Sequence, residues 1–294
     1  MKHESSKSLI VKLGIMLLVC LIPTRLNAQK ATSLFEKGKY EKAEQYCSKQ
    51  KGEDQKSCYK EVAECYFKIE NHDKAAECYA KTNNSKDGYY KIANAYFDLD
   101  SLEVAAEYYA RTDKSKDGYL KVANAYFTKK NLEKAAEYYA KTDQYNDGYL
   151  KIANAYFDIQ NYIKAEEFYT KTDNFTEGFQ KIADIYFTTE NYEAASKLFR
   201  KIGNEEKAEE CLSLIIIKYT AMLIRGQIGE EIVREKMTLA FEQTNMSECV
   251  FLKKTVETAF STFVKILGDG NTSEMQVYSK LIEYLTAVFK SSCS

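Results

Sequence analysis

A repeat of 30 residues is the feature that most constrains what this chain can fold into. A stretch that begins at Asp87 returns with few changes at Asp117 and at Asp147, and a looser copy begins at Glu177. The segment that begins at Ser57 fits the same frame. A fixed period of this size predicts a solenoid, in which each unit buries its apolar face only against its neighbours.

Each repeat has the pattern of two helices. Apolar residues recur at helical spacing in both halves of the repeat from Asp87: first Tyr89, Ile92, Ala93 and Tyr96, and then Leu102, Ala105, Ala106 and Tyr109. The only proline is Pro23, so the repeats contain none to interrupt a helix. A short polar residue suited to cap the second helix stands between the halves: Asn71, Ser101, Asn131, Asn161 or Asn191. We therefore expect antiparallel helical hairpins.

The repeats resemble the tetratricopeptide repeat (TPR) family over roughly residues 30 to 206. The residues that carry the resemblance in one unit are Tyr149, Ile152, Ala153, Tyr156, Ala165 and Tyr169, and Gly38–Ala43 matches the turn between the family's helices. The chain departs from the family in its period of 30 rather than about 34 residues and in lacking the proline near the end of helix B. The resemblance implies an all-α, right-handed superhelical solenoid whose first helices, helix A of each hairpin, line a concave groove.

The N-terminus has the pattern of a signal peptide over residues 1–28. Basic residues precede the apolar run 13–22, and a cleavage site follows Ala28. The run is shorter than the roughly 20 residues that a spanning helix needs, so we expect no membrane insertion after cleavage; an uncleaved N-terminal anchor is the alternative. We therefore expect an extracytoplasmic protein, periplasmic or secreted.

Beyond the signal peptide, the sequence divides into an array and a C-terminal region. We expect about six hairpins in residues 29–206 and a helical capping region in residues 207–294, because an open solenoid end exposes apolar surface. Four helices are predicted in the cap: 207–225, 229–243, one begun by a capping box at Asn245 and stopped by Gly268, and one begun at Asn271. For the third of these the predicted inward stripe is Leu252, Val256, Phe260, Phe263 and Leu267.

Seven of the eight cysteines lie beyond Ala28. An exported chain would meet an oxidising compartment, where Cys47 and Cys58, which flank one connector between helices, could form a disulfide. A Cys65–Cys78 bond is a weaker alternative, because later units place Ala95 and Tyr108 at those positions.

Little in the sequence indicates catalysis, a cofactor or a metal. His72 is the only histidine after the signal peptide, and we expect it at the surface of a turn. There is no glycine-rich phosphate loop, and no cysteine spacing indicates zinc. Residues 29–294 carry a formal net charge of −4, against −1 for the whole chain, which gives no support to nucleic-acid binding. We expect a non-enzymatic protein without cofactors.

Polar and aromatic side chains recur on one face of the predicted first helices. If helix A lines a groove, as the TPR resemblance implies, lysine and asparagine could hold a partner's backbone or carboxylates and aromatic rings could grip apolar side chains. The alternative is structural, with phenylalanine packed between units and asparagine bonded to a neighbouring helix terminus. The candidate partner-binding residues are Lys91, Asn94, Lys121, Asn124, Lys151, Asn154, Tyr90, Phe97, Phe127 and Phe157.

The sequence thus predicts an exported interaction scaffold that binds proteins or peptides along its concave face. The alternative is a structural envelope protein that acts by self-association through tyrosine-rich surfaces or an unpaired cysteine.

Overall fold

The computed structural model describes residues 26–293, and all the regular structure in that range is helical. The predicted signal peptide lies outside the described residues except for its last three positions. Two of these pack: Asn27 accepts a hydrogen bond of 2.7 Å from the Tyr46 hydroxyl and donates one to Asp54, and Ala28 is buried. No helix within this range combines the length and apolarity needed to cross a bilayer.

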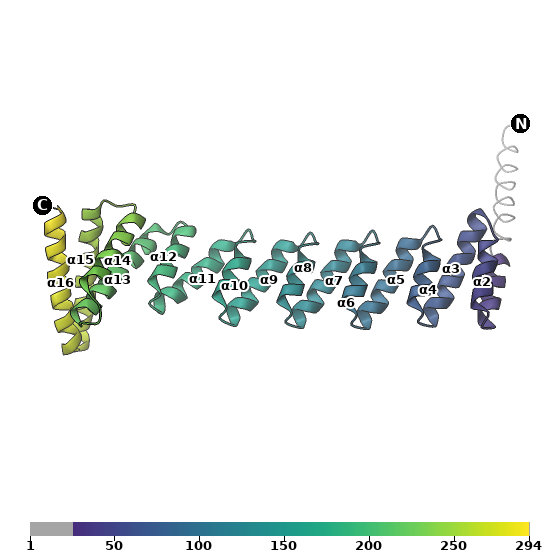
Figure 1. Ribbon diagram of the computed structural model, residues 1–294, viewed down its shortest axis with the longest axis horizontal. Helices are drawn as coiled ribbons and strands as arrows, with labels where there is room; N and C mark the ends of the chain where they lie inside the picture. Colours follow the sequence, from purple (N-terminus) through teal and green to yellow (C-terminus); the bar gives the residue numbers. More distant parts are fainter. Residues whose placement is uncertain (1–25, 294) are drawn as a thin grey trace, which may run out of the picture. The chain divides into compact units, whose positions relative to one another are not determined.

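The chain forms two compact units, which are described separately, one ending at Gly148 and the other beginning at Tyr149. In the first unit, helices that follow one another along the chain pack side by side as hairpins (Figure 1). After a helical segment at 26–36, its helices are α2 (Tyr40–Ser48), α3 (Gly52–Lys68), α4 (His72–Tyr79), α5 (Ser85–Asp98), α6 (Leu102–Tyr109), α7 (Ser115–Thr128) and α8 (Leu132–Tyr139).

The second unit continues the hairpins and ends in a helical bundle. Helix α9 (Tyr145–Asp158) spans the boundary between the units, and α13 packs against α14, α15 and α16 (Figure 1). The remaining helices are α10 (Tyr162–Tyr169), α11 (Phe175–Thr188), α12 (Tyr192–Lys201), α13 (Glu205–Ile224), α14 (Glu230–Gln243), α15 (Glu248–Asp269) and α16 (Thr272–Cys293). The all-α solenoid of antiparallel helical hairpins is therefore confirmed.

The turn inside each hairpin is built from a left-handed residue and a cap. In α3–α4, Glu70 has φ 60°, and the Asn71 amide reaches back to the Tyr66 carbonyl, which ends the first helix as a Schellman motif. The Asn71 side chain then accepts the Lys74 amide and starts the second helix. Asn131, Asn161 and Asn191 cap in the same way, but Ser101 makes no such bond.

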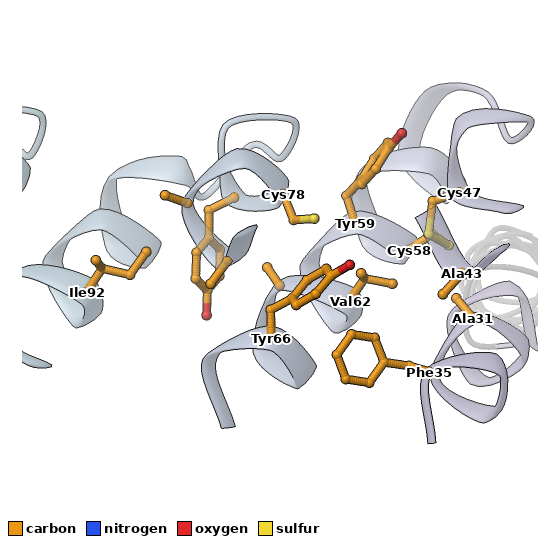
Figure 2. Close-up of a cluster of buried hydrophobic side chains, with 14 residues drawn as sticks. Ala31, Phe35, Ala43, Cys47, Cys58, Tyr59, Val62, Tyr66, Cys78 and Ile92 are labelled. Carbon is orange, nitrogen blue, oxygen red and sulfur yellow. A yellow bond between two sulfur atoms is a disulfide. The ribbon is translucent and has the colours of Figure 1, made fainter. Parts of the chain in front are cut away.

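The interior of each hairpin follows the predicted stripes. Ile92, Ala93 and Ala105 are fully buried, and equivalent positions are buried in the neighbouring hairpins. Figure 2 shows the N-terminal cluster, where the rings of Phe35 and Tyr66 meet edge to face with centroids 4.8 Å apart. The prediction for His72 is wrong: its ring is buried, with centroids 5.2 Å from Phe67 and 5.3 Å from Tyr96. An imidazole fits there because the turn folds back onto these aromatic rings.

A tyrosine ring joins each internal hairpin to the next. The ring of Tyr109, at the end of α6, lies on Gly118 in α7, where an added Cβ would come within 2.2 Å of the ring. Glycine is required there because any side chain would occupy the space of the ring. We call these contacts the tyrosine–glycine joints: Tyr79–Gly88, Tyr109–Gly118, Tyr139–Gly148 and Tyr169–Gly178.

The first joint is covalent. Cys58 lies 30 residues before Gly88, and Cys47 stands at the position equivalent to Tyr79, because the first connector is two residues longer. The two cysteines form a disulfide bond, with their Cα atoms 5.4 Å apart (Figure 2). Cys65 and Cys78 are free thiols. The pairing expected from sequence is thus present at the position where later hairpins have a tyrosine and a glycine.

The C-terminal bundle departs from the predicted one in α15. The helix begins at Glu248, so Asn245 lies outside it, and it continues past Gly268 to end at Asp269, where Gly270 caps it with φ 71°. Phe260 is 57% exposed and Leu267 49%, so the predicted inward stripe is wrong at these positions. The buried side of α15 is Phe251, Leu252, Thr255 and Ala259.

The ends of the α15–α16 hairpin are linked by a disulfide that sequence analysis missed. Cys249, at the start of α15, is bonded to Cys293, at the end of α16. Asn271 accepts the Glu274 amide and starts α16 as predicted, and Leu281 and Leu285 are buried on its inner side. The free thiols of the described chain are Cys65, Cys78 and Cys211.

Candidate functional site

The candidate residues lie on the first helix of each hairpin, on a surface that we call the helix-A face. The lysines on this face are exposed. Lys91 forms an ion pair of 2.7 Å with Glu64 of the preceding hairpin. Lys121 instead meets an amide, donating to Asn94 Oδ1 at 3.1 Å. These ammonium groups are therefore held near the preceding hairpin while remaining accessible to solvent.

The asparagines have a structural partner that the sequence did not reveal. The hydroxyl of Tyr109, whose ring forms the joint to the next hairpin, donates to Asn94 Oδ1 at 2.7 Å. The same bond of 2.6 Å joins Tyr139 to Asn124 and Tyr169 to Asn154. The partner is thus a tyrosine in the second helix of the same hairpin, not the helix terminus considered above.

This bond fixes the direction of the Asn94 amide. An ammonium group can only donate hydrogen bonds, so the atom of Asn94 that meets Lys121 must be the oxygen. The Tyr109 hydroxyl reaches the same oxygen. The amide NH₂ is left as a hydrogen-bond donor, and no side-chain hydrogen bond from it is found among residues 26–293.

Burial keeps the joint tyrosines neutral. It raises the pKa of Tyr109 to about 12, with smaller contributions from the nearby Tyr90 and Asp98. Burial also raises the pKa values of Tyr139 and Tyr169. The neutral hydroxyl is the form that can donate to asparagine, so these hydrogen bonds persist across the ordinary pH range.

The phenylalanines of the candidate set are not fully exposed, and one of them packs within its own hairpin. Phe97, Phe127 and Phe157 are half-buried. The ring of Phe157 lies 5.6 Å from Tyr162, across the turn between the two helices of its hairpin. This placement favours the structural interpretation for the phenylalanines and leaves only part of each ring for a partner.

Tyr90, Asn94 and Lys121 come together in one cluster. The Tyr90 ring lies 5.6 Å from that of Tyr109, and the ammonium groups of Lys114 and Lys121 lie 5.0 and 5.5 Å from its centroid. Lys114 was not predicted, since it lies in the connector before α7. The cluster combines a half-buried aromatic ring and a half-buried amide donor with two exposed cations.

The second unit has a groove of about 620 Å³ between α13 and α15. Glu206 and Glu210 line one wall, Lys254 and Lys265 line the other, and Leu214 lies between them. Sequence analysis missed these residues, although the period could have indicated two of them: Glu210 and Leu214 lie 30 residues after Gln180 and Asp184 of the helix-A face.

The described part of the chain contains no group of three His, Cys, Asp or Glu residues placed to hold a metal ion. The residues of the helix-A face are hydrogen-bond donors and aromatic rings, which suit recognition of a surface rather than coordination of a metal.

A model of the tetratricopeptide repeat matches residues 117–144 and 176–202. Both matched segments are hairpins of the array described above. In these two segments the chain is similar to the TPR family. The array of hairpins in residues up to Gly148 contains the disulfide-bonded first joint and most of the candidate residues.

Several solved structures are similar to this chain. The crystal structure of MamA is 21% identical, with a TM-score of 0.26, and the match covers 52% of this chain and 96% of that one. The C-terminal part of a TPR repeat-containing protein from Cytophaga hutchinsonii is 16% identical, with a TM-score of 0.27, and the match covers 79% of this chain and 98% of that one. The structure of pilF from Pseudomonas aeruginosa is 15% identical, with a TM-score of 0.26, and the match covers 64% of this chain and 96% of that one. No curated protein matches this chain.

Proposed function

We propose that this protein is an exported scaffold that binds protein or peptide partners along the helix-A face. TPR repeats typically serve as non-catalytic platforms for protein–protein interaction, and this chain matches their model. The observation that carries the proposal is the fixed orientation of the Asn94 amide, whose oxygen is held by Tyr109 and Lys121 while its NH₂ remains available.

The chemistry of this face indicates the kind of partner. Amide NH₂ groups and lysine ammonium groups are donors, so they match backbone carbonyls and carboxylates. Because Asn94 and Asn124 occupy equivalent positions in successive hairpins of the first unit, they could meet successive acceptors along one partner segment. We therefore propose an extended peptide segment that carries acidic side chains.

Export is supported by the cysteines. Two disulfides, Cys47–Cys58 and Cys249–Cys293, are formed in the structure, and such bonds persist in oxidising compartments. Together with the predicted signal peptide, they favour a periplasmic or secreted location.

Self-association finds less support. The joint tyrosines are buried between hairpins, as are the free thiols of Cys78 and Cys211. Cys65 is the half-buried free thiol of the described chain, so the joint tyrosines and the other two free thiols offer no contact surface for a second copy.

The decisive experiment compares two variants that break the same internal hydrogen bonds. Asn94→Ala, Asn124→Ala and Asn154→Ala together remove the bonds and the amide donors, whereas Tyr109→Phe, Tyr139→Phe and Tyr169→Phe together remove only the bonds. Partners are captured by cross-linking in the native compartment. We expect the asparagine variant to lose partners that the tyrosine variant retains. Equal retention by both variants would show that the helix-A face is not the binding surface.

A further inference from the structure

The groove between α13 and α15 has walls of opposite charge. Glu206 and Glu210 stand on the α13 wall, and Lys254 and Lys265 stand on the α15 wall, where Glu257 is the one carboxylate. Within residues 26–293, none of these five side chains forms an ion pair or a side-chain hydrogen bond. The charges of the two walls therefore face each other across the groove without neutralising each other.

The floor of the groove is apolar and aromatic. Phe187, Tyr192 and Leu214 are half-buried and line it, and the rings of Phe187 and Tyr192 lie 5.6 Å apart. Half-buried rings at the bottom of a hollow gain free energy when an apolar side chain covers them. The α15 wall adds the hydroxyl-bearing residues Thr258, Ser261 and Thr262.

The length of the α15 wall suits a short helix. Lys254 and Lys265 are eleven residues apart on α15, so the wall between them extends about 16 Å, or three helical turns. The lining consists of side chains from helices, and the second unit offers no strand edge in its described residues to which an extended peptide could add. A helix that lies in a groove is recognised through an apolar ridge and its flanking edges.

We propose that this groove binds an amphipathic helix of a partner protein. The apolar ridge of that helix covers Phe187, Tyr192 and Leu214. One edge carries lysine or arginine toward Glu206 and Glu210, and the other carries aspartate or glutamate toward Lys254 and Lys265. The residues expected only to cap the array thus form one wall of a recognition site.

This inference rests on the proposed scaffold function but concerns a different surface from the asparagines of the helix-A face. The helix-A face offers donors for an extended acidic segment, whereas the groove offers both charges and an aromatic floor. One partner could present both features, or two partners could use one each.

The test uses a fluorescent synthetic peptide of about 15 residues with a leucine ridge, a lysine edge and a glutamate edge. A peptide of the same composition with its leucines scattered serves as the control. Anisotropy with the full chain should show tighter binding of the ridged peptide. Glu206→Gln with Glu210→Gln, or Lys254→Gln with Lys265→Gln, should weaken its binding about three- to tenfold, since each partly exposed charge contributes modestly.

The matched protein control is Glu235→Gln with Glu242→Gln, two exposed carboxylates on α14 outside the groove. This variant should bind like the wild type, and so should the triple asparagine variant of the helix-A face. Equal binding of the two peptides, or unchanged binding by both groove variants, would overturn the proposal. A dimer in sedimentation that the groove variants abolish would also overturn it, by identifying a second copy as the occupant. A failure of the helix-A face experiment would leave these results intact.

Discussion

The first joint of the array and the joints that follow it use the same two positions with different chemistry. Cys47 and Cys58 form a covalent bond where Tyr109 and Gly118 form a packing contact. An internal hairpin is stabilised by neighbours on both sides, but among residues 26–293 the first hairpin has a neighbouring hairpin on one side only. A disulfide restricts the unfolded chain and so stabilises a hairpin that lacks the second neighbour. The comparison indicates that the contact between neighbouring hairpins, more than the contacts inside one hairpin, determines the stability of the array.

The last hairpin of the array varies the joint in a third way. Phe199 stands where the others have tyrosine, and Ala208 stands where they have glycine. Phe199 has no hydroxyl, and the equivalent of Asn94 is Asp184, which accepts hydrogen bonds from Gln180 and Lys207. In this hairpin, where the hydroxyl is absent, the asparagine and the glycine are absent too. Tyrosine, asparagine and glycine occur together at the joints of Tyr109, Tyr139 and Tyr169, whereas the Tyr79–Gly88 joint has Glu64 at the asparagine position.

The largest effect is expected from filling an internal joint. Gly118→Ala places a Cβ 2.2 Å from the Tyr109 ring, so we expect the free energy of unfolding to fall by about 3 kcal/mol. Urea titration followed by circular dichroism measures it. The control is Gly268→Ala, in helix α15 with no atom within 4 Å of the added Cβ, which should be neutral or stabilising. Equal losses in the two variants would contradict the joint model.

A smaller loss is expected from opening the first joint. Cys47→Ala with Cys58→Ala removes a disulfide that closes a separation of 11 residues, so the free energy of unfolding should fall by about 2.5 kcal/mol. The same urea titration under oxidising conditions measures the loss. Cys65→Ala removes a free, half-buried thiol and should cost much less. If both variants unfold at the wild-type midpoint, the covalent joint contributes nothing to stability.

The smallest loss is expected from removing one joint hydroxyl. Tyr109→Phe keeps the ring on Gly118 but deletes the bond to Asn94, so we expect a loss of about 1 kcal/mol. The pKa of Tyr109 is raised to about 12 in the folded protein, above the value of about 10 in an unfolded chain. The contribution of this hydroxyl is therefore fully present below pH 10 and is lost as the pH rises through 12.

Urea titrations of the wild type and Tyr109→Phe from pH 8 to 12 measure this dependence. The difference between them should be constant up to pH 10 and should shrink above it. Asn94→Ala combined with Tyr109→Phe should cost less than the sum of the single changes, because both remove the same hydrogen bond. A difference that stays constant through pH 12, or strict additivity, would argue against the bond.

The sequence predicted the features that depend on spacing along one helix. The period defined the hairpins, and the position of Asn131 between the two halves of its repeat predicted that it caps the second helix. The Cys47–Cys58 pair was indicated because the two cysteines flank one connector between helices. The hydrogen bond between Tyr109 and Asn94 was not predicted, because the two residues lie 15 positions apart on different helices. How far along each helix they meet is decided by the packing of the two helices.

The bundle shows a second limit of sequence patterns. Helix α15 carries apolar residues around most of its circumference, so the stripe through Phe260 was as plausible as the true inner side through Phe251 and Ala259. Only contact with α13 and α16 decides between them. The groove between α13 and α15 was missed for the same reason, because the charged residues on its two walls lie more than 40 positions apart in the sequence.

The joints also bear on how such a chain can grow. Each segment equivalent to residues 87–116 brings one glycine that receives a ring from the segment before it and one tyrosine that supplies a ring to the segment after it. Duplicating or deleting one whole segment therefore leaves every tyrosine ring packed on a glycine. Adding or removing only part of a segment would leave one ring without its glycine partner. Duplication or deletion of gene segments could thus lengthen or shorten this protein in steps of thirty residues while every tyrosine–glycine joint keeps both of its partners.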